Sequence, residues 1–288
     1  MPSEKLASGE NLLKGELAAA WNILEGSSGD YTDLGIARRF GGSAAAYSLR
    51  DIGAMNGRVV KVRRDSDDEE EDFSANQVAS GALEDFVGSG NDGFVSIWYD
   101  QSGNGNDAVQ ASASNQPAIV QNGGLVTDGI RFETDNELET GGNITASTIT
   151  GFVVANLKGT NANSLYSLGS DSSAAPSVLF GNPSLSYAIN GGTPLAGGTA
   201  PTFANSLFTQ LFISGGTSKS FIDGSQIASG DAGSNTASSG KITIGNLASS
   251  TRYANIAMNE LIVFISDKST DQDEIEKDIA NFYNITLS

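Results

Sequence analysis

The sequence predicts an all-β sandwich with a helical arm at its N-terminus and a further helix at its C-terminus. Short apolar runs recur along residues 44–265 at a spacing of roughly 8–12 residues, and polar turns rather than long helices separate them. Glycine supplies 35 of the 288 residues, about 12% against a norm of about 7%. The hydrophobic content of 39% is sufficient for a core. These three features together are typical of a turn-rich β protein.

The N-terminal segment is the one part of the first half with a helical pattern. Across residues 10–25, large apolar side chains recur at three- and four-residue steps and so share one helix face: Leu13, Leu17, Trp21 and Leu24. This face either packs on the chain's own domain or docks on a neighbouring subunit. A Gly/Ser/Asp-rich joint at residues 26–30 keeps the docking-arm hypothesis open. We therefore expect an arm over 1–35 and a sandwich over 36–288.

The strands of the sandwich follow in order as short apolar or alternating runs. They are expected at 59–63, 94–99, 129–132, 148–156, 165–168, 178–180, 185–189, 208–214, 219–222, 241–244 and 258–265. Asp223-Gly224 stands between two such runs and is a strong signal for a hairpin turn. The acidic run at 63–72 is expected to form a solvated, mobile loop.

A C-terminal helix is expected over residues 271–282. Ser269 or Thr270 is a suitable N-cap, and acidic residues occupy the first turn, where the helix dipole favours negative charge. Ile275, Ile279 and Phe282 recur on one face, which we expect to be buried.

Composition excludes several kinds of site and partner. The chain has neither cysteine nor histidine, so it has no disulfide, thiolate nucleophile or imidazole base. The formal charge of −18 argues against nucleic acid and anionic membranes as partners, because both need clustered Lys and Arg. The N-terminus lacks the pattern of a secretory signal peptide, and no window approaches the roughly 20 apolar residues of a membrane span.

The most distinctive polar segment is the loop over residues 98–107. Asp100, Ser102 and Asn104 are spaced like the first half of a calcium-binding loop, and hard cations take such oxygen ligands. The alternative is a network in which these side chains hydrogen-bond to nearby backbone N–H groups. Trp98 and Tyr99 are expected in the core rather than as a sugar-stacking surface. No cofactor is expected apart from this calcium ion.

An ordered series of motifs carries a family resemblance. The motifs are Ala45-Ala-Tyr-Ser-Leu-Arg50, Val59-Val-Lys-Val-Arg-Arg64, Phe94-Val-Ser-Ile-Trp-Tyr-Asp-Gln-Ser-Gly-Asn-Gly-Asn-Asp107 and Gln116-Pro117. The series resembles the opening of the arabinofuranosidase B catalytic domain, and it looks like that of many proteins of tailed bacteriophages and marine bacteria. Residues 208–264 are similar to laminin G-like jelly rolls, and 265–285 look like the terminal helix of the phage-type proteins. The resemblance implies a concanavalin A-like jelly-roll β-sandwich.

The enzyme part of the resemblance has no counterpart in this chain. We find no segment that matches the one holding the family's catalytic nucleophile, and the paired cysteines near its sugar site are absent. Because function resides in sites rather than folds, we expect no enzymatic activity.

Three hypotheses for function follow from the resemblance together with the missing signal-peptide pattern, the absence of cysteine and the possible docking arm. The first is a structural protein of a tailed-phage virion, a capsid decoration or tail appendage made in the host cytoplasm. It would assemble with other virion proteins and form a homo-oligomer, and its role would be decoration, stabilisation or the binding of a host-surface glycan. The alternatives are a free or cell-surface carbohydrate-binding module or adhesin, and an arabinofuranosidase-like glycoside hydrolase.

Overall fold

The computed structural model describes residues 35–53, 57–142, 144–158, 163–169, 177–180, 187–198, 203–246 and 254–288. From Ile36 to Ser288 the chain forms one compact unit. The predicted arm, with Leu13, Leu17, Trp21 and Leu24, lies outside the described residues. Docking by the arm therefore stays a prediction.

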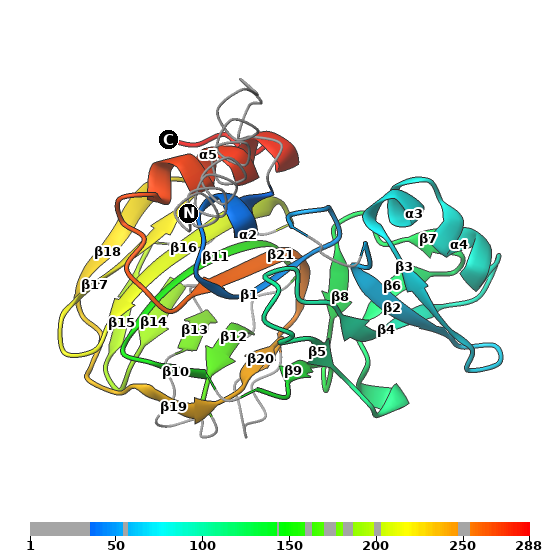
Figure 1. Cartoon of the computed structure of the whole chain (residues 1–288), viewed down its shortest axis with the longest axis horizontal. Helices are drawn as coiled ribbons and strands as arrows, with labels where there is room; N and C mark the ends of the chain where they lie inside the picture. The colour runs from blue at the N-terminus through cyan, green and yellow to red at the C-terminus, as the bar shows by residue number, and fades with distance from the viewer. Residues whose placement is uncertain are drawn as a thin grey trace, which may run out of the picture. The chain divides into compact units, whose positions relative to one another are not determined.

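Two antiparallel layers of strands make up the sandwich (Figure 1). In order of pairing, the first layer contains β1 (Ser43–Ser48), β21 (Ile256–Phe264), β11 (Thr148–Leu157), β16 (Asn205–Ile213), β17 (Thr217–Ile222) and β18 (Ser225–Asp231). The second contains β5 (Ala108–Val109), β9 (Leu138–Thr140), β20 (Ile242–Ile244), β12 (Asn163–Leu168), β13 (Ser177–Phe180), β14 (Tyr187–Asn190) and β15 (Pro194–Gly197).

A smaller lobe joins one edge of the two layers. Its strands are β2 (Val60–Arg64), β3 (Glu70–Phe73), β4 (Gly93–Trp98), β6 (Ala118–Gln121), β7 (Gly124–Leu125) and β8 (Ile130–Phe132). Strand β8 pairs with β21 of the first layer, and β4 pairs with β5 of the second. The helices α3 (Ala75–Ala79) and α4 (Ala82–Val87) lie in this lobe, at the right of Figure 1. Strands β10 (Ile144–Ala146) and β19 (Ala237–Gly240) form a separate pair, and Ala113–Asn115 form one 3₁₀ turn.

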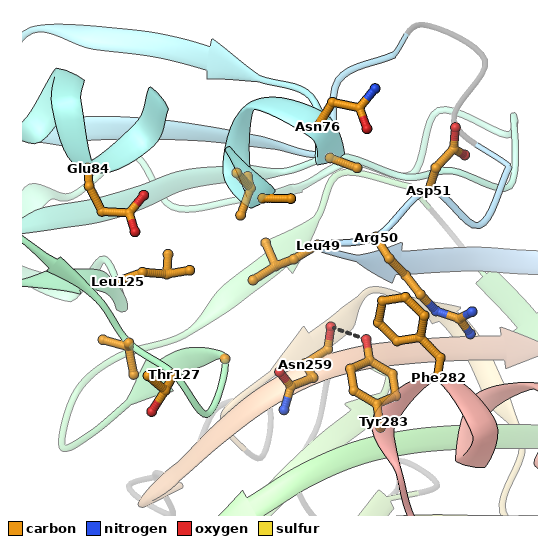
Figure 2. Close-up of a pocket in the computed structure, with 15 residues that line it drawn as sticks. Leu49, Arg50, Asp51, Asn76, Glu84, Leu125, Thr127, Asn259, Phe282 and Tyr283 are labelled. Atoms are coloured by element: carbon orange, nitrogen blue, oxygen red, sulfur yellow. Dashed lines mark hydrogen bonds between the residues drawn. The ribbon is translucent and has the colours of Figure 1, made fainter. Parts of the chain in front are cut away.

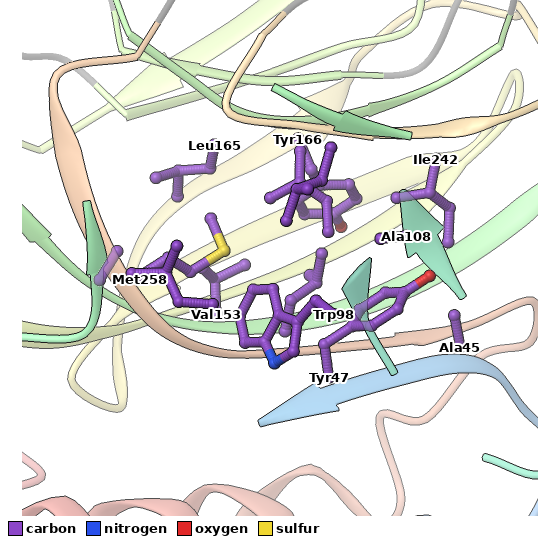
Figure 3. Close-up of a cluster of buried hydrophobic side chains, with 14 of the residues drawn as sticks. Ala45, Tyr47, Trp98, Ala108, Val153, Leu165, Tyr166, Ile242 and Met258 are labelled. Carbon is purple, nitrogen blue, oxygen red and sulfur yellow. The ribbon is translucent and has the colours of Figure 1, made fainter. Parts of the chain in front are cut away.

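The main core fills the space between the layers. Tyr47 and Trp98 pack with ring centroids 5.6 Å apart. Figure 3 shows them beside side chains from both layers, among them Val153, Tyr166 and Ile242. The prediction that Trp98 and Tyr99 are core residues is confirmed, because both side chains are buried.

A second core lies on the outer face of the first layer. Helix α5 (Gln272–Tyr283) packs Ile275 and Ile279 there, and the short helix α2 (Ile36–Arg39) adds Ile36. The strand residues beneath are Phe152, Val154, Leu207, Ile262 and Phe264. Since β11 and β21 are covered on both faces, they are buried along almost their whole length and consist mostly of apolar residues.

The predicted all-β sandwich with its C-terminal helix is confirmed. Strands β17 and β18 form the expected hairpin, and Asp223 and Gly224 have φ of 49° and 82°, as a two-residue turn of this type requires. Along the part of the chain that the structure describes, no helix has the length and apolar character to cross a membrane.

Three local predictions are wrong. The acidic run is solvated as predicted, but it is not simply a loop: its ends belong to the paired strands β2 and β3, and Arg64 binds Asp67 and Glu69 in the turn between them. Helix α5 has Asp271 as its N-cap rather than Ser269 or Thr270. Phe282 is 53% exposed instead of buried with Ile275 and Ile279.

Candidate functional site

A cavity of about 590 Å³ lies where the smaller lobe meets the end of α5 (Figure 2). The loop after β1, helix α3, the first turn of α4, residues 125–129, the bulge of β21 and the end of α5 form its walls. Leu49, Val78 and Leu125 supply an apolar surface, and Asn76, Thr127 and Asn259 supply hydrogen-bonding groups. An apolar lining with a few polar groups is typical of small-molecule sites of this size.

Two carboxylates line this cavity, on different elements. Glu84 extends from α4, and within the described ranges its buried Oε2 atom has no hydrogen-bond partner. Asp51 follows β1, and its Oδ1 accepts a bond of 3.0 Å from the Gly53 N–H. Figure 2 shows Glu84 and Asp51 on opposite sides of the drawn cavity residues. A buried carboxylate oxygen without a partner costs free energy, which makes Glu84 the candidate that a ligand would satisfy.

An ion-pair network fixes the wall formed by α5. Arg50 donates to both oxygens of Glu260, from Nε at 2.8 Å and from Nη2 at 3.0 Å, and it also reaches Asp278 at 3.2 Å. Its guanidinium lies 4.5 Å from the centroid of the Phe282 ring. Glu260 is buried on β21 and also accepts bonds from Ser48 and Tyr283. One network therefore joins the loop after β1, strand β21 and α5.

Protonation states in this network follow from its geometry. Burial alone would lower the pKa of Arg50. The charge and hydrogen bonds of Glu260 outweigh this effect, so the pKa of Arg50 is raised above its ordinary value. Burial and the negative charge of Glu260 raise the pKa of the Tyr283 phenol well above its ordinary value. Arg50 is therefore a fixed cation and Tyr283 a fixed hydroxyl donor at neutral pH.

A second pair of carboxylates lies on the outer face of the second layer. Glu137 and Glu139 are two residues apart at β9 and so point to the same face. Glu139 accepts bonds from Lys241 at 2.9 Å and Thr243 at 3.3 Å, and Glu137 accepts one from Asn246 at 2.8 Å. The Glu139 hydrogen bond and charge raise the pKa of Lys241. Each of these carboxylates has a protein partner, in contrast to the buried oxygen of Glu84.

The loop proposed for calcium is tied to β1 by hydrogen bonds. Asp100 Oδ1 accepts from the N–H groups of Ala46 and Ser102, and Oδ2 accepts from Ser102 Oγ and the Asn106 N–H, all at 2.7–3.0 Å. Asn104 Nδ2 donates to a carbonyl of β1 at 2.7 Å. These bonds form the network that was the alternative to a calcium site, in which the loop side chains hydrogen-bond to nearby backbone groups. In the described ranges, no three acidic side chains are grouped to hold a metal ion, and calcium binding stays a prediction.

Sequence reasoning missed the residues that line the cavity. Ser74-Ala-Asn-Gln77 is a capping-box pattern, and the structure has both of its hydrogen bonds at the start of α3. That pattern would have located one wall. Nothing in the sequence brings Arg50 and Glu260 together, since 210 residues separate them.

No protein-family model matches the chain, and no curated protein matches it significantly. Solved structures do. An arabinofuranosidase complexed with arabinofuranosyl-α-1,2-xylobiose is similar with a TM-score of 0.61 and 16% identity, over 85% of this chain and 64% of that one. A glutamate-to-glutamine mutant of a GH54 α-L-arabinofuranosidase, soaked with 4-nitrophenyl α-L-arabinofuranoside, is similar with a TM-score of 0.60 and 16% identity. The match covers 84% of this chain and 63% of that one. A GH54 α-L-arabinofuranosidase soaked with a cyclic sulfate inhibitor is similar with a TM-score of 0.55 and 15% identity, over 84% of this chain and 63% of that one.

These likenesses show the fold. The chain folds as the sandwich of GH54 arabinofuranosidases, and it spans about 64% of the length of the first of these enzymes. The expectation that the chain is not an enzyme is contradicted, because its fold over 84–85% of its length is that of glycoside hydrolases. The sequence argument required a recognisable catalytic segment, whereas the fold persists at 16% identity.

The similar structures are arabinofuranosidases with bound arabinofuranosides. The sandwich is therefore one that glycoside hydrolases use, and these matches give the virion hypothesis no support. The virion location, the homo-oligomer and the protein partners stay predictions.

Proposed function

We propose that this protein is a glycoside hydrolase that acts on arabinofuranosyl-substituted saccharides, with the cavity beside Arg50 as its substrate site. The observation that carries the proposal is the presence of two carboxylates, Asp51 and Glu84, across one cavity in a glycoside hydrolase fold. The similar structures bind arabinofuranosides, which supports this substrate class.

The two carboxylates are the kind of groups that glycoside hydrolysis uses. One carboxyl group donates a proton to the glycosidic oxygen as the bond to the anomeric carbon breaks. The other carboxylate attacks that carbon or activates the water that does. Water supplies the hydroxyl group of the released sugar and restores the proton.

The remaining cavity residues bind and orient the sugar. Asn76 and Thr127 offer amide and hydroxyl groups to the sugar hydroxyls. Asn259 offers its Oδ1, because its Nδ2 already donates to the Asp128 carbonyl and to Asn205 Oδ1. The exposed ring of Phe282 offers an apolar surface, and the Arg50 network holds α5 in place beneath it. A rigid wall of this kind is what a precise substrate geometry requires.

Release of 4-nitrophenol from 4-nitrophenyl α-L-arabinofuranoside tests the proposal. We expect turnover by the wild-type protein, and a fall of about 10²–10⁴-fold in kcat for Glu84→Gln or Asp51→Asn, the range that acid–base catalysis contributes. The matched control is Asp85→Asn, an exposed neighbour outside the cavity, which should stay within about twofold of wild type.

Two results would contradict the proposal. Loss of activity in Glu139→Gln with normal activity in Glu84→Gln would move the catalytic site to the face of β9 and β20. Binding of the arabinoside without any turnover would instead support the carbohydrate-binding module.

A further inference from the structure

A row of asparagine side chains continues the outer face of the first layer beyond α5. Phe152 and Val154 of β11 face α5, and by alternation Asn156 has the same orientation. Asn156 is paired directly with Asn205 of β16. Asn259, at the bulge of β21, donates from Nδ2 to Asn205 Oδ1 at 3.3 Å. Three adjacent strands thus each contribute one amide side chain.

One member of this row has an unused hydrogen-bonding atom. The Asn156 side chain is 3% exposed, and its Oδ1 has no hydrogen-bond partner among the residues that the structure describes. Leaving a buried amide oxygen unpaired opposes folding, so we expect a donor here from outside the described residues, either water or a bound ligand. The neighbouring Asn205 is partly exposed, so the row is open to solvent at that strand.

A strained, exposed phenylalanine lies beside the row. Phe203 is 71% exposed and has φ of 60°, a conformation that bulky side chains rarely adopt. Its N–H donates to the carbonyl of Leu157, the residue after Asn156, at 2.9 Å. Strain of this kind persists where it serves a function, and here it presents an aromatic ring to solvent.

We propose that Asn156, Asn205 and Asn259, together with the Phe203 ring, form a binding subsite for a neutral saccharide unit next to the cavity. Asn259 belongs to both places, because it also lines the cavity. Amides donate to and accept from sugar hydroxyls, and an aromatic ring packs on an apolar sugar face. The nearby charges of Lys158 and Asp128 pair with each other, which favours an uncharged ligand.

The choice of ligand rests on the proposed function. If the cavity takes the arabinofuranosyl group, the subsite takes the backbone sugars that carry it. Xylobiose is therefore the probe, because it lacks an arabinofuranosyl bond and survives any arabinofuranosidase activity.

Calorimetric titration of the full chain with xylobiose tests the subsite. We expect binding by the wild-type protein and at least fivefold weaker binding by Phe203→Gly, Asn156→Leu and Asn205→Ala. Glycine adopts a φ of 60° freely, so Phe203→Gly should fold with an unchanged or higher Tm. The control is Ile265→Ser, another exposed apolar side chain, which should bind xylobiose as wild type does.

The outcomes separate this inference from the proposed function. Weakened xylobiose binding in the variants supports the subsite even if no arabinoside is hydrolysed. Absence of binding by the wild-type protein, or equal affinity in Phe203→Gly and wild type, overturns the subsite and leaves water as the partner of Asn156.

Discussion

Replacing Arg50 by Met should be among the most destabilising single changes in this wall of the cavity. Glu260 is only 1% exposed, and the substitution removes its cation and both guanidinium hydrogen bonds. Breaking a buried pair from one side costs about 3–5 kcal/mol, because the remaining charge is buried without compensation. For a domain of this size, each kcal/mol lowers Tm by about 2–4 °C. We therefore expect Tm to fall by about 6–20 °C.

Thermal unfolding followed by circular dichroism measures this effect against a matched surface pair. Arg58 binds Asp72 at 3.0 Å, with side chains 43% and 31% exposed, so Arg58→Met should cost about 0–1 kcal/mol. Adding Glu260→Leu to Arg50→Met should recover part of the lost stability, because no buried charge is left. A loss below about 1 kcal/mol for Arg50→Met, or a double variant no more stable than the single one, would refute the reasoning.

Three other predictions concern stability. Burial raises the pKa of Glu276 above its ordinary value of 4.5. The contribution of Glu276 to the free energy of unfolding is therefore fully present below pH 4.5, and it is lost as the pH rises through the pKa of the folded state. Glu276→Gln should thus gain stability over wild type in urea unfolding at pH 7 and show no such gain at pH 4. Gly151→Ala should cost about 1–3 kcal/mol or more by the same measurement, because its Cβ would lie 2.0 Å from the Tyr166 hydroxyl, whereas Gly141→Ala meets nothing within 4 Å. Deleting residues 1–30 should leave Tm nearly unchanged, since the unit from Ile36 has its own core; a fall of many degrees would count against this.

Local signals in the sequence were sufficient for much of the fold. The Asp223-Gly224 turn and the helix near 271–282 depend on neighbouring residues, and both were predicted correctly. The hairpin in the acidic run was not predicted, because charge composition alone indicates a loop. In the structure, the ion pair with Arg64 and the pairing with β2 stabilise β3. Phe282 matches the apolar period of α5 but lies past the covered face, where it stacks on Arg50.

The candidate site was less predictable than the fold. Its carboxylates, Asp51 and Glu84, lie in segments without a catalytic motif, and only tertiary packing brings them to one cavity. The resemblance at the motifs around Tyr47 and Trp98 correctly indicated the sandwich, because these residues form its core. Core motifs report on the fold, whereas the chemistry depends on residues that the motifs do not contain.

The most direct test of the account is a crystal structure of Glu84→Gln soaked with arabinofuranosyl-α-1,2-xylobiose. The account predicts the arabinofuranosyl ring in the cavity between Asp51 and residue 84, with the xylobiose part extending over Asn205 towards the Phe203 ring. A ligand bound on the face of β9 and β20, in contact with Glu139 and Lys241, would contradict the assignment of the cavity as the active site.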